Sequence, residues 1–175
     1  MKQKFLIFAA LAALVAGLNG CNKQETPASD DSRKQGFEIE NVVVDITLSQ
    51  DNTKASITLK DIRFSEQMPL LITLRIPDVP VTRQGESIRF NWNDTENAIT
   101  PIAIVRGQES AYEAYKVTTV NGAVEPDPKD GTKKSCNLSS IAFVGTNPEK
   151  PANVTTAFQG NLLDGLRFEG TFRVE

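Results

Sequence analysis

The chain has 175 residues, of which 19 are basic, 22 are acidic and none is histidine. Its formal charge of −3 has the wrong sign for nucleic-acid binding, which requires a basic surface. The lack of histidine excludes Ser–His and Cys–His nucleophile pairs and histidine-ligated zinc. We therefore expect a protein that is not an enzyme, with no cofactor, no metal site and no nucleic-acid partner.

The first twenty residues have the layout of a secretory signal. Two lysines precede an uninterrupted apolar run of 14 residues, Phe5–Leu18. A membrane-spanning helix needs about 18 or more apolar residues, so this run is too short to remain as an anchor. The next residues, Leu18-Asn19-Gly20-Cys21, resemble the lipobox of bacterial lipoproteins. The resemblance implies a signal peptide over residues 1–20 and lipid attachment at Cys21.

Residues 21–36 are polar and carry no large apolar side chain. We expect them to form a flexible tether with a reach of about 20 Å. Loss of the signal removes two of the 19 basic residues, which leaves 17 against 22 acidic ones, a charge of −5. Acyl chains rather than attraction to anionic lipid headgroups are therefore expected to hold the protein on its membrane.

Two features of the tether bear on location. Asn22 stands where an aspartate retains enterobacterial lipoproteins in the inner membrane, so we expect the outer membrane. Ser29-Asp30-Asp31 resembles the acidic stretch that directs some Bacteroidetes lipoproteins to the cell surface, although an ordinary solvated linker accounts for it equally well. The expected location is therefore the periplasmic or the extracellular face of the outer membrane.

The remaining residues, 37–175, alternate apolar and polar side chains in many short segments, as half-buried β-strands do. The alternation changes parity after Leu59, which predicts a β-bulge near Lys60-Asp61. Pro77 and Pro80 predict a sheet edge or a sharp bend, because proline donates no backbone hydrogen bond. The alternating or apolar segments are residues 42–48, 55–64, 70–76, 88–92, 99–104, 112–120, 138–144, 155–163 and 166–174.

Between these segments, Ser110–Tyr115 could form one helical turn, and Asn121–Lys134 is expected to be a loop or the end of a long hairpin. Sustained helical periodicity is missing from the whole domain. About eight to ten short, evenly spaced strands predict one all-β domain, either a single antiparallel β-barrel or a closed sandwich.

Three segments resemble a known family: Ala55–Phe64, Met68-Pro69-Leu70 and Ile76–Thr82. They are similar to the calycin-like (lipocalin-like) β-barrel lipoproteins of Bacteroidetes, over residues 38–95. The resemblance implies a small barrel related in shape to the lipocalins. It implies no catalytic residues and brings no particular ligand with it.

Aromatic side chains are the candidates for a binding site. Phe64, Phe90, Trp92 and Phe143 could line the mouth of a barrel that holds a small hydrophobic or glycan-like ligand. The alternative is that these residues are simply core. Trp92 is the strongest candidate, because it ends a strand beside a polar turn and could stack on a sugar ring or a lipid tail.

Two other features favour structural roles. Cys136 has no partner for a disulfide once Cys21 is acylated, so we expect an inert, partly buried thiol. Asp127–Gly131 contains two acids and a glycine, but it lacks the alternating oxygen ligands of a calcium loop, so we interpret it as a plain turn.

Three functional hypotheses follow. The first is an outer-membrane-anchored lipoprotein whose barrel binds a small hydrophobic or glycan-like ligand. The second is a non-catalytic structural or protein-interaction module, such as an adhesin or an accessory subunit with a protein partner at the cell surface. The third is a carboxylate-based hydrolase, although no motif among the 22 acidic residues singles out a catalytic pair.

Overall fold

The computed structural model describes residues 36–149 and 152–175, so the expected signal peptide, Cys21 and all of the tether except Gly36 lie outside the described residues. The regular structure in the described part is entirely β-strand. No helix there is long and apolar enough to cross a membrane. The strands are β1 (Phe37–Leu48), β2 (Lys54–Ile62), β3 (Ile72–Gln84), β4 (Ser87–Asn93), β5 (Ile102–Val105), β6 (Gln108–Ala111), β7 (Tyr115–Asp127), β8 (Asp130–Gly145), β9 (Val154–Asp164) and β10 (Arg167–Val174).

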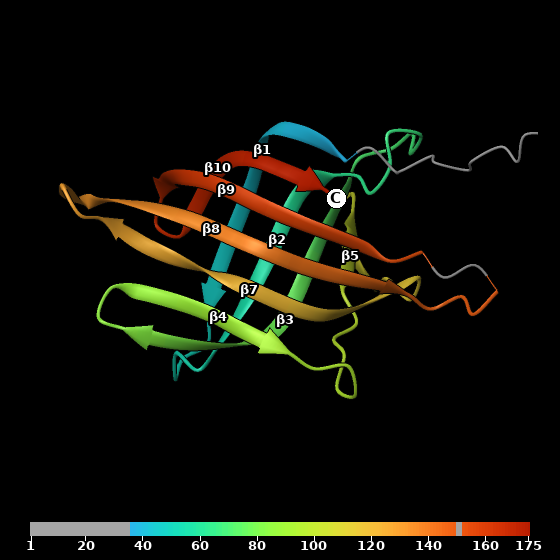
Figure 1. Ribbon diagram of the computed structural model, residues 1–175, viewed down its shortest axis with the longest axis horizontal. Coiled ribbons are helices and arrows are strands. Elements are labelled where there is room, and N and C mark those ends of the chain that lie inside the picture. Colours follow the sequence, from blue (N-terminus) through green and yellow to red (C-terminus); the bar gives the residue numbers. More distant parts are fainter. Residues whose placement is uncertain (1–35, 150–151) are drawn as a thin grey trace, which may run out of the picture. The chain divides into compact units, whose positions relative to one another are not determined.

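Eight of these strands close into an antiparallel barrel, which confirms the predicted all-β fold in its barrel form (Figure 1). Their order around the barrel is β1-β2-β3-β4-β7-β8-β9-β10, and the pairing of β10 with β1 completes the ring. Phe37 lies opposite Val174, and Val44 lies opposite Phe168. The barrel therefore closes by joining the two ends of the described domain.

The hairpin β5–β6 branches from the barrel at β3. Residues 73–75 pair with β5, whereas residues 81–84 on the same edge pair with β4. Pro77 and Pro80 fall between these two pairings, where the described chain offers that edge of β3 no partner and a missing N–H is tolerated. Asp78, between the prolines, has a φ of 56°. Of the predicted sheet edge or sharp bend at these prolines, the sheet edge is confirmed.

A β-bulge interrupts β2 where the apolar pattern changes parity. Leu59 pairs with Leu74 and Ile62 pairs with Ile72, so β2 advances three residues while β3 advances two. Asp61 takes up the extra length with a φ of 56°, in the left-handed region. The bulge predicted near Lys60-Asp61 is confirmed. It keeps both Leu59 and Ile62 inside the barrel, where each is fully buried.

Inward-facing side chains from the barrel strands form a single apolar core. An eight-stranded barrel is just wide enough for side chains to fill it. Burial of this core, at about 25 cal/mol per Å² of apolar surface, is the main source of stability. The largest fully buried side chains are Phe143, Phe158, Phe168, Phe172, Ile57, Leu59, Ile62, Leu74, Ile76, Leu138, Ile141 and Val42.

The two uncertain segments are resolved by strand pairing. Residues 110–111 belong to β6, and residues 112–114 connect it to β7 without a helix, so the helical-turn prediction is wrong. Residues 121–134 form the end of the long hairpin β7–β8. At its tip the Asp127 carboxylate accepts a hydrogen bond from the Lys129 N–H, 2.8 Å from nitrogen to oxygen, as in a plain turn.

Cys136 lies inside the barrel and is fully buried. Burial disfavours the thiolate and raises the pKa of the thiol from 9.0 to about 12. The unfolded chain therefore loses this proton first, and the contribution to stability is complete below pH 9 and declines as the pH rises toward 12. We expect the free energy of unfolding to fall by about 1.4 kcal/mol per pH unit within this window.

Comparison with Cys136→Ala isolates this effect from the titration of lysines and tyrosines. Urea unfolding of both proteins at pH 8 and pH 10 should show a fall in the free energy of unfolding that is larger in the native protein than in the variant. Equal pH dependence in the two proteins, or rapid alkylation of the native thiol at pH 8, would contradict the buried, protonated state.

Candidate functional site

The structure places most of the predicted aromatic site inside the core. Phe64, Phe90 and Phe143 are 8%, 2% and 0% exposed. Trp92 is partly buried and packs against the same core, opposite Val120 of β7. Three of the four candidates are therefore core side chains, which is the alternative that the sequence left open, and Trp92 retains partial exposure.

An aromatic cluster closes one end of the barrel. The ring centroids of Phe64 and Phe143 lie 4.6 Å apart, and those of Phe64 and Tyr115 lie 5.1 Å apart. Tyr112 stacks on Tyr115 at 5.9 Å. Such tilted and stacked pairs add stability beyond their buried area. At the expected barrel mouth there is a hollow of about 310 Å³ beside Phe64, bordered also by Phe37 and Val154.

A larger hollow, about 560 Å³, lies on the outer face of β8, β9 and β10. We call it the polar groove. Along these strands, inward-facing and outward-facing side chains alternate. Cys136, Leu138 and Phe158 point inward and are buried, so the side chains between them point outward. The outward-facing side chains that line it are Ser135, Asn137 and Ser139 of β8, Gln159 and Asn161 of β9, Glu169, Thr171 and Arg173 of β10, and Glu38 of β1.

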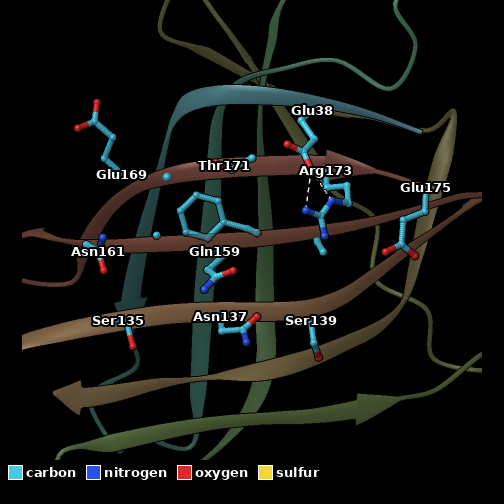
Figure 2. Close-up of a pocket in the computed structure, with 14 residues that line it drawn as sticks. Glu38, Ser135, Asn137, Ser139, Gln159, Asn161, Glu169, Thr171, Arg173 and Glu175 are labelled. Carbon is cyan, nitrogen blue, oxygen red and sulfur yellow. Dashed lines mark hydrogen bonds and ion pairs between the residues drawn. The ribbon is translucent and has the colours of Figure 1, made fainter. Parts of the chain in front are cut away.

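Strand register arranges the groove in cross-strand rows. Asn137 lies opposite Gln159, and Gln159 lies opposite Thr171. Figure 2 shows the Gln159 side chain extending from β9 toward Asn137 on β8. The described residues provide no hydrogen-bond partner to these three side chains. The central row therefore presents two amides and a hydroxyl, which can both donate and accept hydrogen bonds.

Two facing glycines form the next cross-strand row. Gly160 of β9 pairs with Gly170 of β10, and both line the groove. A Cβ on Gly170 would collide with the carbonyl oxygen of Gln159 and with the Cα of Gly160. The strands can approach this closely only because glycine has no side chain. Glycine thus permits the close approach of β9 and β10 along the groove.

The charges of the groove oppose an anionic ligand. Its only cation among the described residues, Arg173, is bound to Glu38, with 2.7 Å from Nε to Oε1 (Figure 2). Glu169 and Glu175 add negative charge at the rim. An anionic ligand would meet these carboxylates without a free cation to balance them. The arrangement is suited to hydrogen bonding with an uncharged, polar molecule.

Sequence reasoning missed the groove, although a signal for it is present. Ser135, Asn137 and Ser139 alternate with buried Cys136 and Leu138, but we expected the strand to begin only near Leu138. Small polar residues on the outer face of a strand resemble a loop in sequence. Their grouping with Gln159 and Thr171 depends on strand pairing, which a single segment does not reveal.

The fold and the groove together define a closed eight-stranded antiparallel β-barrel with a polar hollow on its outer wall. Comparison of the chain with protein-family models, with curated proteins and with solved structures finds no match.

Proposed function

We propose that this chain is a lipid-anchored, non-catalytic binding module of the bacterial outer membrane, and that the polar groove holds a glycan-like ligand. The row of Asn137, Gln159 and Thr171 carries the proposal. Each of these side chains is a neutral hydrogen-bonding group directed outward from a rigid sheet. Sugar hydroxyls are donors and acceptors at once, and amides and hydroxyls match them in both roles.

The outer wall fits such a ligand better than the interior does. The inner face of the barrel is close-packed with apolar side chains, and the hollow beside Phe64 is smaller than the groove. A small hydrophobic ligand would have to displace core packing, which is costly in close-packed interiors. Trp92, only partly buried, remains a secondary candidate for contact with a sugar ring.

The anchoring part of the proposal is supported by the sequence. Leu18-Asn19-Gly20-Cys21 resembles a lipobox, and the barrel agrees in form with the Bacteroidetes calycin-like lipoproteins that residues 38–95 resemble. We include membership of that family in the proposal. Membership would place the domain on the periplasmic or extracellular face of the outer membrane.

The groove can be tested with Asn137→Ala combined with Gln159→Ala. The probes are soluble, uncharged oligosaccharides: maltoheptaose, cellohexaose and chitohexaose. We expect at least one to shift the amide NMR signals of β8, β9 and β10 in the native protein. Loss of two hydrogen-bonding groups, each worth about 1 kcal/mol, should weaken its binding by roughly 30-fold.

The matched control is Asn91→Ala, which removes an exposed amide from the outer face of β4, outside the groove. It should leave both binding and stability unchanged. A panel without any ligand-linked NMR shift, or equal weakening by the control, would count against the groove.

The anchor is tested by Cys21→Ser in the native bacterium. Without an acyl acceptor, and with no core residue in the tether, the variant should move from the membrane to the soluble fraction while its domain stays folded. Fractionation with immunodetection measures this, and circular dichroism checks the fold. A variant that stays in the membrane fraction would contradict lipid anchoring at Cys21.

A protein-interaction module is the second candidate function. Within the described residues, β6 pairs only with β5, and its four residues are exposed. Its open edge could accept an added strand from a protein partner. Protection of the β6 amides from hydrogen exchange at high protein concentration, with no response to any oligosaccharide, would favour this candidate.

A further inference from the structure

Exposed large apolar side chains are concentrated at one end of the barrel. Chain direction and register define this end, which we call the tether end: β1 begins there after Gly36, β2 ends there, and β3 begins there. Four of the five such side chains in the described residues lie at it. They are Leu70 (72% exposed), Leu71 (55%), Val105 (57%) and Val144 (36%), and we call them the apolar tip.

Strand pairing places all four at the tether end. Leu70 and Leu71 immediately precede β3. Val105 lies one residue beyond the pair formed by Ile104 with Thr73, near the start of β3. Val144 pairs with Lys116, at the start of β7 and the end of β8. In Figure 1 the green loop before β3 and the start of β1 lie on the same side of the barrel.

The opposite end provides a comparison. Its turns join β1 to β2, β3 to β4, β7 to β8 and β9 to β10. Among the described residues, Leu163, 52% exposed, is the one large exposed apolar side chain there. Single exposed apolar residues are ordinary, whereas a group on one surface marks an interaction site. Adjacent leucines that point into solvent also contribute nothing to the core. An apolar partner at the tether end would account for this grouping.

We propose that the apolar tip inserts into the surface of the lipid bilayer to which Cys21 is anchored. This inference rests on the proposed anchoring, because the tether connects Cys21 to this end of the domain. Fifteen residues separate Cys21 from β1, a reach of about 20 Å. The tether thus holds the tip near the bilayer, so insertion is in effect intramolecular and even weak apolar contacts suffice.

The net charge of the loops at the tether end favours one kind of lipid headgroup over another. The described loops at the tether end, residues 63–71, 94–101, 106–107, 112–114 and 146–149, carry five acidic and two basic residues. Their net negative charge opposes anionic headgroups. The tip is therefore matched to zwitterionic lipid, in which burial of leucine and valine is favourable and repulsion is absent.

The first experiment uses the full-length lipidated protein in phosphatidylcholine vesicles that contain brominated acyl chains. A bimane fluorophore is attached at Leu71→Cys or, as a control of equal exposure at the opposite end, at Leu163→Cys. Because Cys136 is fully buried, we expect it not to react with the label under native conditions. We expect bromine to quench the probe at position 71 and to spare the probe at position 163. Equal quenching at both positions would overturn the proposal.

The second experiment separates the tip from the anchor. The mature chain with Cys21→Ser, without the signal peptide over residues 1–20 and labelled at Val105→Cys, is titrated with phosphatidylcholine vesicles. Without the anchor we expect partition that is weak but measurable at high lipid concentration. Leu70→Ser with Leu71→Ser should reduce it about 100-fold, roughly tenfold for each leucine removed from lipid. Phosphatidylglycerol should weaken partition relative to phosphatidylcholine.

The outcomes distinguish the two proposals. If Cys21→Ser chains partition into vesicles and native chains prove not to be acylated, the proposed lipid anchor is refuted. The proposed insertion of the apolar tip is then retained. If the two serine substitutions leave partition unchanged, the proposed insertion of the apolar tip is overturned. It is also overturned if the chain forms concentration-dependent dimers that bury the probe at Val105 without lipid. Both leucines are exposed, so the serine variants should retain the thermal stability of the native domain.

Discussion

Phe143→Ala is expected to lower the free energy of unfolding by about 4 kcal/mol, because large-to-small changes at buried aromatic residues cost 3–5 kcal/mol. Phe143 is fully buried and its ring lies 4.6 Å from that of Phe64. Alanine would leave a cavity at the aromatic cluster and remove the contacts with Phe64 and Tyr115. Since a domain of this kind is stable by about 5–15 kcal/mol, the loss is a large share of the total.

Urea unfolding followed by Trp92 fluorescence measures this change. The control is Leu163→Ala, which trims a 52% exposed side chain and should change stability by less than about 0.5 kcal/mol. A loss below about 1 kcal/mol for Phe143→Ala would mean that the interior tolerates vacancies. It would revive the hypothesis of a ligand inside the barrel.

Gly170→Ala is expected to be the second most damaging change, at about 3 kcal/mol, the upper part of the usual range for overpacking. The added Cβ would lie 2.7 Å from the carbonyl carbon of Gln159, closer than such atoms approach in proteins. The atoms in its path are backbone, so β9 and β10 must separate. Separation breaks the Gly160–Gly170 pairing and alters the floor of the polar groove.

Gly131→Ala is the matched control, because a Cβ at that position meets nothing within 4 Å. It should leave the free energy of unfolding within about 0.5 kcal/mol of the native value. Unfolding in urea compares the two variants, and the oligosaccharide titration tests whether Gly170→Ala also weakens binding. Equal stability of both variants would show that the strands do not approach as closely as described.

Much of the fold could be predicted from the sequence because it depends on local alternation. The parity change after Leu59 located the bulge at Asp61, and the prolines at positions 77 and 80 located the interrupted edge of β3. Both effects act within a few residues: an inward position must stay inward, and proline has no N–H. The failure at Ser110–Tyr115 has the complementary cause, because a short polar segment has little pattern and its pairing with β5 decided its conformation.

The candidate site, in contrast to the fold, could not be predicted from local alternation. An aromatic side chain can serve a ligand or a core equally well, and the sequence carries no measure of burial. Phe64, Phe90 and Phe143 proved to be buried. The polar groove was missed because its members come from three strands and acquire meaning only when register sets Asn137, Gln159 and Thr171 in a row.

The sequence by itself thus determined the class of fold, the position of its irregularities, the absence of histidine chemistry and the expectation of a lipid anchor at Cys21. These depend on composition and on short-range patterns. Only the tertiary structure decided that the barrel is closed and packed, that the outer wall carries a polar hollow, and that Leu70, Leu71, Val105 and Val144 share one end. Those properties arise from pairing between distant segments, and pairing is set by the whole sheet rather than by any one strand.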